Sequence, residues 1–276
     1  MDATDHSAIL QLRVEDAAGG MVLSTEAHWN QTEDDWRMFL THGTVFGIRD
    51  TEGALVATAA VLPYSGGNAW ISMVLVAAGW RRRGFATRLL DTCLDMTARE
   101  RLTTWLDATA AGAAIYGPLG FTPSIQLQRL RFEGTALPSQ GLRLLSVGHL
   151  DELISRDRRA MGFDRSTLLG ELSRRPGSTL VTREGAICLV REGRTARQIG
   201  PLYADHTSSA AGLIEDVIRA APGPYLLDIA GDQHRLMESL LRDGWAIERS
   251  FQRMRFGRIM TSGTELPFAG AGPEYG

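Results

Sequence analysis

Residues 73–90 read Met-Val-Leu-Val-Ala-Ala-Gly-Trp-Arg-Arg-Arg-Gly-Phe-Ala-Thr-Arg-Leu-Leu, and this stretch decides the fold. Its apolar start continues a strand that we expect over 69–76, and its end opens a helix expected over 84–100. The turn between them carries three arginines, 81–83, followed by Gly84. The first N–H groups of a helix have no partner within the helix, and the helix dipole favours negative charge there. The stretch therefore predicts an anion-binding site where a buried strand passes into a helix.

Neither of the common glycine-rich phosphate loops accounts for this site. The chain contains no GxGxxG pattern at the turn and no GxxxxGK[ST] pattern. All 29 basic residues are arginine, so chemistry that needs a Schiff-base lysine or a P-loop lysine is excluded. The competing interpretation of the turn is a solvated basic helix start.

The composition is that of an ordinary globular protein of two domains. The chain has 276 residues, of which 44% are hydrophobic and 22% are charged. Its net charge of −3 argues against binding to nucleic acid. No apolar run reaches the roughly 18 residues that span a membrane, and the first residues are acidic and polar, unlike a secretory leader. We therefore expect a cytoplasmic protein that binds neither nucleic acid nor membrane.

Cysteine and histidine give no sign of a metal or redox centre. The two cysteines, Cys93 and Cys188, are far apart, and neither has CxxC spacing. The six histidines form no HxxxH or HxH pair. We expect no metal site, and we expect Cys93 to be buried on the apolar side of its helix.

The pattern of the chain predicts alternating strands and helices in both halves. In the first half we expect strands at 8–14, 44–49, 54–63, 69–76, 103–108 and 124–132, and helices at 15–28, 32–42, 84–100 and 111–119. In the second half we expect strands at 142–147, 178–190, 196–203, 224–230 and 248–256, and helices at 207–221 and 233–242. The last residues, from Thr261 to Gly276, predict a loose tail because they carry Gly, Pro and Ser without periodicity.

The two halves are predicted to be repeats of one fold. Leu119-Gly120-Phe121 in the first half matches Asp243-Gly244-Trp245 in the second, and an arginine-bearing strand follows each. The turn-rich segment near residue 135 separates them. The predicted organisation is a first domain over 1–134, a linker over 135–142, a second domain over 143–258 and a C-terminal tail over 259–276.

Two motifs resemble those of the GNAT superfamily of N-acetyltransferases. Arg81-Arg82-Arg83-Gly84-Phe85-Ala86 fits the family's [QR]-x-x-G-x-[GA] motif, and residues 115–121 resemble its L-Y-x-x-L-G-F signature. The whole chain is similar to the tandem subfamily, in which a catalytic GNAT domain precedes a degenerate one. The fold class that this implies is α/β, with two tandem GNAT-like domains. Each domain would be a mixed, mostly antiparallel twisted sheet flanked by helices.

The resemblance implies an acetyl-CoA-dependent N-acetyltransferase that acts by direct attack of a primary amine, without a ping-pong intermediate. In the family, a tyrosine at the position of Tyr116 protonates or hydrogen-bonds the departing thiolate, and a backbone N–H, here that of Val74 or Leu75, polarises the thioester carbonyl. The implied acetyl-CoA-binding residues are Val74, Leu75, Val76, Arg81, Arg82, Arg83, Gly84, Phe85, Ala86, Thr87 and Thr109.

The acceptor side of the site is less defined by the sequence. Trp29 and Asn30 lie where GNAT proteins usually shape the acceptor pocket. A general base could be Glu26, His28, Asp34, Asp35 or His42, or a chain of water molecules could carry the proton. Thr32 and Asp35 resemble a helix-capping pair, which explains Asp35 without catalysis.

The sequence does not fix the acceptor or the role of the second half. There, residues 199–206 replace the anion site without an arginine run, so this domain is not expected to bind coenzyme A. The acceptor could be a small molecule or a peptide. The chain could also be a protein N-acetyltransferase, or a non-catalytic acyl-CoA-binding or regulatory protein. The acyl-chain preference, the formation of a homodimer and the role of the second domain stay open.

Overall fold

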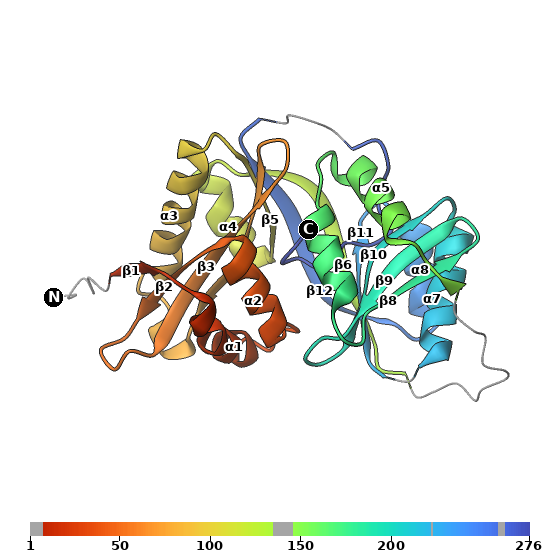
Figure 1. Ribbon diagram of the computed structural model, residues 1–276, viewed down its shortest axis with the longest axis horizontal. Helices are drawn as coiled ribbons and strands as arrows, with labels where there is room; N and C mark the ends of the chain where they lie inside the picture. The colour runs from red at the N-terminus through yellow and green to blue at the C-terminus, as the bar shows by residue number, and fades with distance from the viewer. Residues whose placement is uncertain (1–7, 135–145, 222, 259–262) are drawn as a thin grey trace. The chain divides into compact units, whose positions relative to one another are not determined.

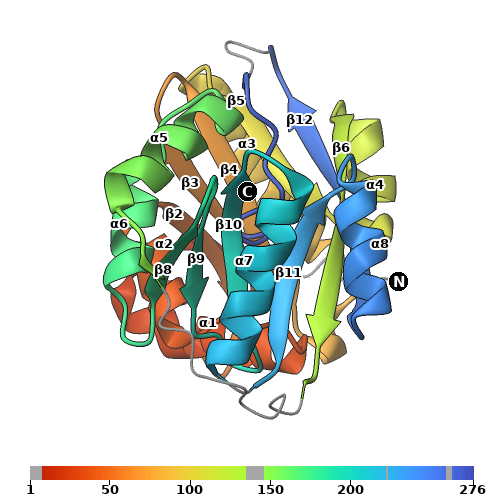
Figure 2. The same cartoon turned by 90° about the vertical axis from the view of Figure 1, so that its right-hand side faces the viewer.

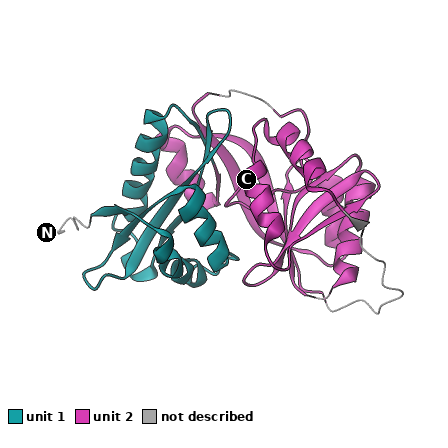
Figure 3. Ribbon diagram, in the orientation of Figure 1, with its two compact units in different colours: residues 1–105 teal, residues 106–276 magenta. Residues whose placement is uncertain are grey.

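The computed structural model describes residues 8–134, 146–221, 223–258 and 263–276. The chain divides into two compact units, residues 1–105 and residues 106–276 (Figure 3). Each unit has a sheet with flanking helices (Figure 1). The predicted linker, residues 135–142, lies outside the described residues.

The strands of the first unit follow one another in the order β1-β2-β3-β4-β5. Neighbours run antiparallel, except that β4 and β5 run parallel, which confirms the predicted mixed, mostly antiparallel sheet. The central strands β3 and β4 are buried over most of their length. The strands are β1 (Ile9–Gln11), β2 (Thr44–Arg49), β3 (Leu55–Tyr64), β4 (Asn68–Val76) and β5 (Thr103–Ala108), whose last three residues belong to the second unit.

Helices cover both faces of this sheet (Figure 1). α1 (Ala17–Glu26) and α2 (Glu33–His42) pack against each other and against β3, and α3 (Phe85–Arg99) packs on β2, β3 and β4. α3 matches the helix predicted over 84–100, and its apolar face is buried as the sequence pattern requires. The buried residues of α3 are Phe85, Leu89, Leu90, Cys93 and Thr97.

The central strand β4 has an irregularity halfway along. The register with β3 shifts between Thr58 and Ala60, opposite Met73, which has a left-handed φ of 52°. The buried hydroxyl of Thr58 donates to the Met73 carbonyl at 2.8 Å and holds this conformation. The parallel ladder with β5 extends only over 68–70, so the β5-side edge of 73–76 has no ladder partner among the described residues of this unit.

The second unit is built on a longer sheet, in the order β12-β6-β11-β10-β9-β8-β7. The β10–β11 pair is parallel, and the other recorded pairs are antiparallel. The strands are β6 (Thr122–Phe132), β7 (Ser146–Val147), β8 (Thr179–Arg183), β9 (Ala186–Arg191), β10 (Arg197–Ala204), β11 (Tyr225–Ala230) and β12 (Ala246–Phe256).

Two helix pairs flank this sheet, α7 with α8 on one face and α5 with α6 on the other (Figure 2). The short α4 stands before β6. The helices are α4 (Ala110–Tyr116), α5 (Leu150–Met161), α6 (Ser166–Arg174), α7 (Thr207–Ala220) and α8 (His234–Arg242). Between α7, α8 and the sheet lies an apolar core that includes Leu213, Leu236 and Trp245.

Strand β6 connects parts of the chain that the linker separates in sequence. It lies between β11 and β12, with Leu130 opposite Leu227 on one side and Leu127 opposite Phe251 on the other. The strand that the sequence places at the end of the first half is therefore paired with two strands of the second half. The predicted domain bounds themselves stay predictions.

The paired motifs of the predicted repeat adopt the same conformation. Gly120 and Gly244 both have a left-handed φ, 98° and 93°, which favours glycine. Phe121 and Trp245, which follow them, are each 3% exposed. The same turn therefore precedes the last long strand of each half.

Two predictions for the second half are wrong. The single strand expected over 178–190 is a hairpin of β8 and β9, with Gly185 at a left-handed φ of 69° in the turn. The tail expected to be loose is ordered and largely buried over 268–276, because its backbone bonds to β10 and β11. α5 and α6 lie within 150–174, a range to which the sequence pattern assigns no element.

Candidate active site

The residues of the predicted anion site lie in the turn between β4 and α3. A short 3₁₀ turn, η2 (Ala78–Trp80), precedes the arginines, and Gly84 is the N-cap of α3 at a left-handed φ of 79°. Arg82 also has a left-handed φ, 64°. No side chain caps the helix start, and a Cβ at Gly84 would meet nothing within 4 Å. The first N–H groups of α3, including those of Phe85, Ala86 and Thr87, are thus open to an external acceptor.

The three arginines are exposed around this helix start. Arg81 donates from Nε to the Val76 carbonyl at 3.1 Å, and Arg83 donates from Nη2 to the Gly79 carbonyl at 3.2 Å. The Arg83 guanidinium also lies 4.6 Å from the centre of the Trp80 ring. These contacts keep positive charge beside the open amides, so the turn can hold a phosphate group by charge and by hydrogen bonds.

The turn is tethered from the opposite side by Glu26 at the end of α1. Its Oε1 accepts a hydrogen bond of 2.6 Å from the Ala78 N–H. Glu26, one of the candidate bases, therefore positions the turn in this structure.

On the β5 side, the edge of β4 beyond its irregularity has no ladder partner among the described residues of the first unit. The Ala77 N–H donates to Val56 on β3 at 2.9 Å. Since N–H groups alternate along an extended strand, those of Val74 and Val76 point to the other edge, and that of Leu75 points to β3. Of the two amides predicted to polarise a carbonyl, the Val74 amide is the better directed.

Two predicted site residues lie in the second unit, on α4. Thr109 is the N-cap of this helix, and its hydroxyl accepts from the Gly112 N–H at 3.3 Å. Tyr116 ends the helix and is partly exposed, with its ring centre 5.8 Å from that of Phe121. Packing on Phe121 fixes the ring and leaves part of the side chain accessible.

The predicted acceptor residues lie between α1 and α2. Asn30 is 6% exposed and Trp29 is partly buried. Trp36, by contrast, is a core residue whose Nε1 donates to Ser24 Oγ at 3.1 Å. Among the described residues, Gln31 Oε1 and Ser72 Oγ are buried polar atoms with no hydrogen-bond partner in the structure.

Gln31 and Ser72 are candidates that the sequence did not identify, because unsatisfied hydrogen bonding of a buried oxygen is visible only in a structure. Of the remaining candidate bases, Asp35 forms the predicted capping box of α2 with Thr32. Its Oδ2 accepts from the Thr32 N–H at 2.7 Å, and the Thr32 hydroxyl accepts from the Asp35 N–H at 3.3 Å.

The thiols are isolated from this chemistry. Cys93 and Cys188 are free and buried, and burial raises the pKa of each thiol to about 12. Within the described ranges, no group of three or more His, Cys, Asp or Glu residues could hold a metal ion. Nor does that part of the chain contain a helix long and apolar enough to cross a membrane.

Family models match both halves of the chain. A model described as the acetyltransferase (GNAT) family matches residues 9–121, and one described as an acetyltransferase (GNAT) domain matches residues 153–269. The chain is also 24% identical over 255 residues to the Bacillus subtilis protein YitH, named an uncharacterized N-acetyltransferase, and the alignment covers 89% of each chain.

Solved structures share the fold over nearly the whole chain. A crystal structure from Pyrococcus horikoshii matches with a TM-score of 0.81 at 17% identity, covering 99% of this chain and 96% of the other. A GCN5-related N-acetyltransferase from Sphaerobacter thermophilus gives 0.64 at 14% identity, covering 95% and 98%. A tandem GNAT protein of the clavulanic acid biosynthesis pathway gives 0.63 at 15% identity, covering 90% and 98%.

Proposed function

Because the chain carries two GNAT acetyltransferase domains in tandem, we propose that it transfers an acetyl group from acetyl-CoA to the primary amine of a small molecule or peptide. The first domain would carry out this reaction. The observation that supports it most directly is the uncapped start of α3, with Gly84 at a left-handed φ and Arg81 to Arg83 around it.

Binding of acetyl-CoA would use two parts of the first unit. The N–H groups at the start of α3, together with Arg82, would hold the pyrophosphate. The N–H groups of Val74 and Val76 on the β5 side of β4 would pair with the pantetheine arm, as an added strand does. The Val74 N–H would then donate to the thioester carbonyl oxygen and stabilise the oxyanion that forms on it.

The transfer itself is a single displacement through a tetrahedral intermediate. The neutral amine nitrogen attacks the carbonyl carbon, a C–N bond forms and the C–S bond breaks. The sulfur takes the hydroxyl proton of Tyr116, and the tyrosinate regains a proton from solvent. The proton lost by the amine passes to a base or to water. A general acid of this kind contributes about 10²–10⁴-fold to the rate.

The acceptor amine would be recognised in the first unit by Trp29 and Asn30, with Gln31 and Ser72 as further hydrogen-bonding groups. The buried oxygens of Gln31 and Ser72 have unused acceptor capacity. Both could accept from an amine or an amide N–H, which suits a polar acceptor better than an apolar one.

The test is release of CoA thiol from acetyl-CoA with a panel of small amines, polyamines and peptides. Wild type is compared with Tyr116→Phe and with Tyr64→Phe, a matched change on β3. We expect an amine-dependent rate that falls about 10²–10⁴-fold in Tyr116→Phe and stays within about twofold in Tyr64→Phe. Mass spectrometry of the product confirms the added acetyl group.

Acetyl-CoA binding without turnover on any amine would instead favour the non-catalytic acyl-CoA-binding protein, or a protein acceptor. Equal rates for wild type and Tyr116→Phe would remove the acid role from Tyr116. Absence of acetyl-CoA binding by calorimetry would overturn the proposal as a whole.

A further inference from the structure

In the second unit, two parallel strands are paired over a short ladder only, as β4 and β5 are, and a gap separates them beyond it. Its central strand β10 pairs in parallel with β11 only through Arg197, Gln198 and Ile199. Beyond them, the register of β10 against β9 shifts between Ile199 and Leu202, as that of β4 against β3 does near Met73. Where a parallel ladder stops in this way, the facing edges of both strands carry N–H and C=O groups that need partners.

In this unit, the partners come from the chain itself. Phe268 N–H donates to the Leu202 carbonyl at 2.9 Å, and Leu202 N–H donates to the Ala269 carbonyl at 3.0 Å. On the other side, Ala230 N–H donates to the Phe268 carbonyl at 3.2 Å, and Gly270 N–H donates to the Asp228 carbonyl at 2.9 Å. Residues 268–270 therefore form a short extended segment bonded to both β10 and β11, bridging Leu202 and Ile229 through Ala269.

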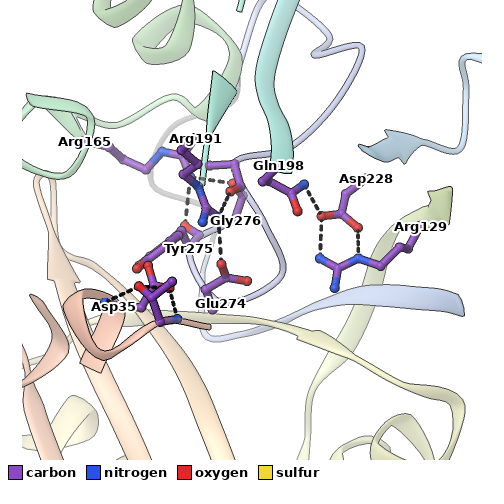
Figure 4. A network of polar contacts seen from close by, with 11 residues as sticks. Asp35, Arg129, Arg165, Arg191, Gln198, Asp228, Glu274, Tyr275 and Gly276 are labelled. Atoms are coloured by element: carbon purple, nitrogen blue, oxygen red, sulfur yellow. Dashed lines mark hydrogen bonds and ion pairs between the residues drawn. The ribbon is translucent and has the colours of Figure 1, made fainter. Parts of the chain in front are cut away.

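Two buried arginines fix the residues that follow (Figure 4). Arg191 donates from Nη2 to the Ala271 carbonyl at 2.7 Å and to Glu274 Oε1 at 2.8 Å. Arg165 donates from Nη1 to the carbonyls of Tyr275 and Gly276, at 2.8 and 2.6 Å. Arg165, Arg191 and Tyr275 are each at most 3% exposed, so the segment is held by buried side chains.

Gly200 of β10, which has no side chain, leaves room in the gap for this segment. A Cβ on Gly200 would lie 2.0 Å from the carbonyl oxygen of Gly270 and 3.1 Å from its carbon. These are backbone atoms of the segment and cannot rotate away, so a side chain at this position is incompatible with the seated segment. The fit therefore depends on glycine in the strand as well as on small residues in the segment.

We propose that the gap between β10 and β11 is a binding site for an extended peptide, and that residues 268–276 are its intramolecular ligand. The segment occupies in the second unit the kind of gap that the proposed function assigns to the pantetheine arm in the first. It satisfies both strand edges, and so the second GNAT domain is closed to acyl-CoA. This inference concerns the second unit and stands whether or not the first unit is a catalyst.

The test is hydrogen exchange on the full chain, read by mass spectrometry with fragmentation that resolves single amides. In wild type we expect the amides of Leu202, Ala230 and Gly270 to exchange at least about 100-fold more slowly than open amides. Saturating acetyl-CoA should leave these rates unchanged. Exchange at the open rate, or release of the segment by acetyl-CoA, would overturn the proposal.

Two glycine variants separate displacement of the segment from backbone strain. Gly200→Ala and Gly223→Ala both place a Cβ at a positive φ, 149° and 141°, but at Gly223 the Cβ meets nothing within 4 Å. We expect Gly200→Ala to speed exchange of Leu202, Ala230 and Gly270 at least about tenfold, and Gly223→Ala to leave them within about twofold of wild type. Equal effects of the two changes would contradict the proposed fit at Gly200.

A second pair of variants serves if Gly200→Ala does not fold. Glu274→Gln weakens the bond to Arg191, and Glu192→Gln makes the same change in an exposed pair with Arg197. Only Glu274→Gln should speed exchange within 268–276. The acetyl-CoA experiment also separates this inference from the proposed function. If the first unit does not bind acetyl-CoA, the proposed function fails, but the amides of Leu202 and Gly270 should still exchange slowly.

Discussion

Arg129 on β6 and Asp228 on β11 are joined by two parallel hydrogen bonds of 2.8 Å, Nε to Oδ1 and Nη2 to Oδ2 (Figure 4). Gln198 of β10 adds a third bond, from Nε2 to Oδ2 of Asp228 at 2.9 Å. Burial by itself would lower the pKa of Arg129, but the charge and hydrogen bonds of Asp228 outweigh it, and the pKa is raised above its usual value. One carboxylate thus links three neighbouring strands, and the backbone carbonyl of the same residue receives the Gly270 N–H.

Removing this carboxylate should destabilise the second unit strongly. Asp228→Ala would leave the guanidinium of Arg129 buried without its counter-charge, which costs about 3–5 kcal/mol of the free energy of unfolding. Chemical denaturation followed by circular dichroism measures the loss. Glu33→Ala breaks the exposed pair of Glu33 with Arg37 and should change the stability by at most about 0.5 kcal/mol. Similar losses in the two variants would mean that the buried pair contributes little.

Gly84 should be needed for acetyl-CoA binding beyond its effect on stability. Gly84→Ala adds a methyl group beside the open amides of α3, and loss of one charge-assisted hydrogen bond would raise the Kd of acetyl-CoA about 10–100-fold. Gly53→Ala is the control, because Gly53 has a similar φ of 87° and an equally open Cβ position. Both variants lose about 1–2 kcal/mol of stability to a left-handed alanine.

Calorimetry measures the Kd of acetyl-CoA for each variant, and unfolding curves measure the stability of each variant. Similar stability losses with weaker binding in Gly84→Ala alone would support the phosphate site. Unchanged binding in Gly84→Ala would place the phosphates elsewhere.

The two thiols should be unreactive in the folded chain. With each pKa raised to about 12, the thiolate fraction at pH 8 is roughly 10⁻⁴, against about a quarter for a free cysteine. Ellman's reagent should therefore react with neither thiol in the native protein and with both in guanidinium. Rapid reaction of a native thiol would show that Cys93 or Cys188 is accessible.

The same thiols give the stability a pH dependence at the alkaline end. Unfolded cysteines lose protons above about pH 8.5, whereas the folded ones keep theirs up to about pH 12. The unfolded state then binds fewer protons, so the free energy of unfolding should fall as the pH rises through this window. Replacing both cysteines by alanine should remove this contribution to the dependence of the free energy of unfolding on pH.

The capping box of α2 offers a local test in the first unit. Thr32→Ala removes the hydroxyl that accepts the Asp35 N–H and should cost about 1 kcal/mol of the free energy of unfolding. Thr32→Ser keeps that hydroxyl and should restore most of the loss. Thermal unfolding measures both variants, and an equal loss in serine and alanine would point to the methyl group instead.

Local patterns in the sequence are enough to predict most elements of the first half. The apolar stripe of α3, the capping pair at Thr32 and Asp35 and the strand at 44–49 all depend on residues close together in the chain. The turn and helix start that carry the predicted anion site can be recognised for the same reason, since they are one continuous stretch.

Features that depend on distant partners are not predictable in this way. Residues 268–276 are small and irregular in sequence, and their burial depends on the gap in the sheet and on arginines about 80 to 110 residues away. The turn between β8 and β9 has only Gly185 as a signal. The unsatisfied oxygens of Gln31 and Ser72 cannot be found without knowing what surrounds them.

The place of β6 in the sheet has a consequence for synthesis of the chain. Phe132 ends β6, and Tyr225, which begins its neighbour β11, is made about 90 residues later. At roughly 5–20 residues per second, the native partners of β6 are made only after a further 5–20 seconds or so of synthesis. Unpaired strand edges recruit other chains. The nascent protein therefore passes through a period in which polysome crowding favours aggregation, and a holding chaperone would be most useful between synthesis of residue 132 and that of β12.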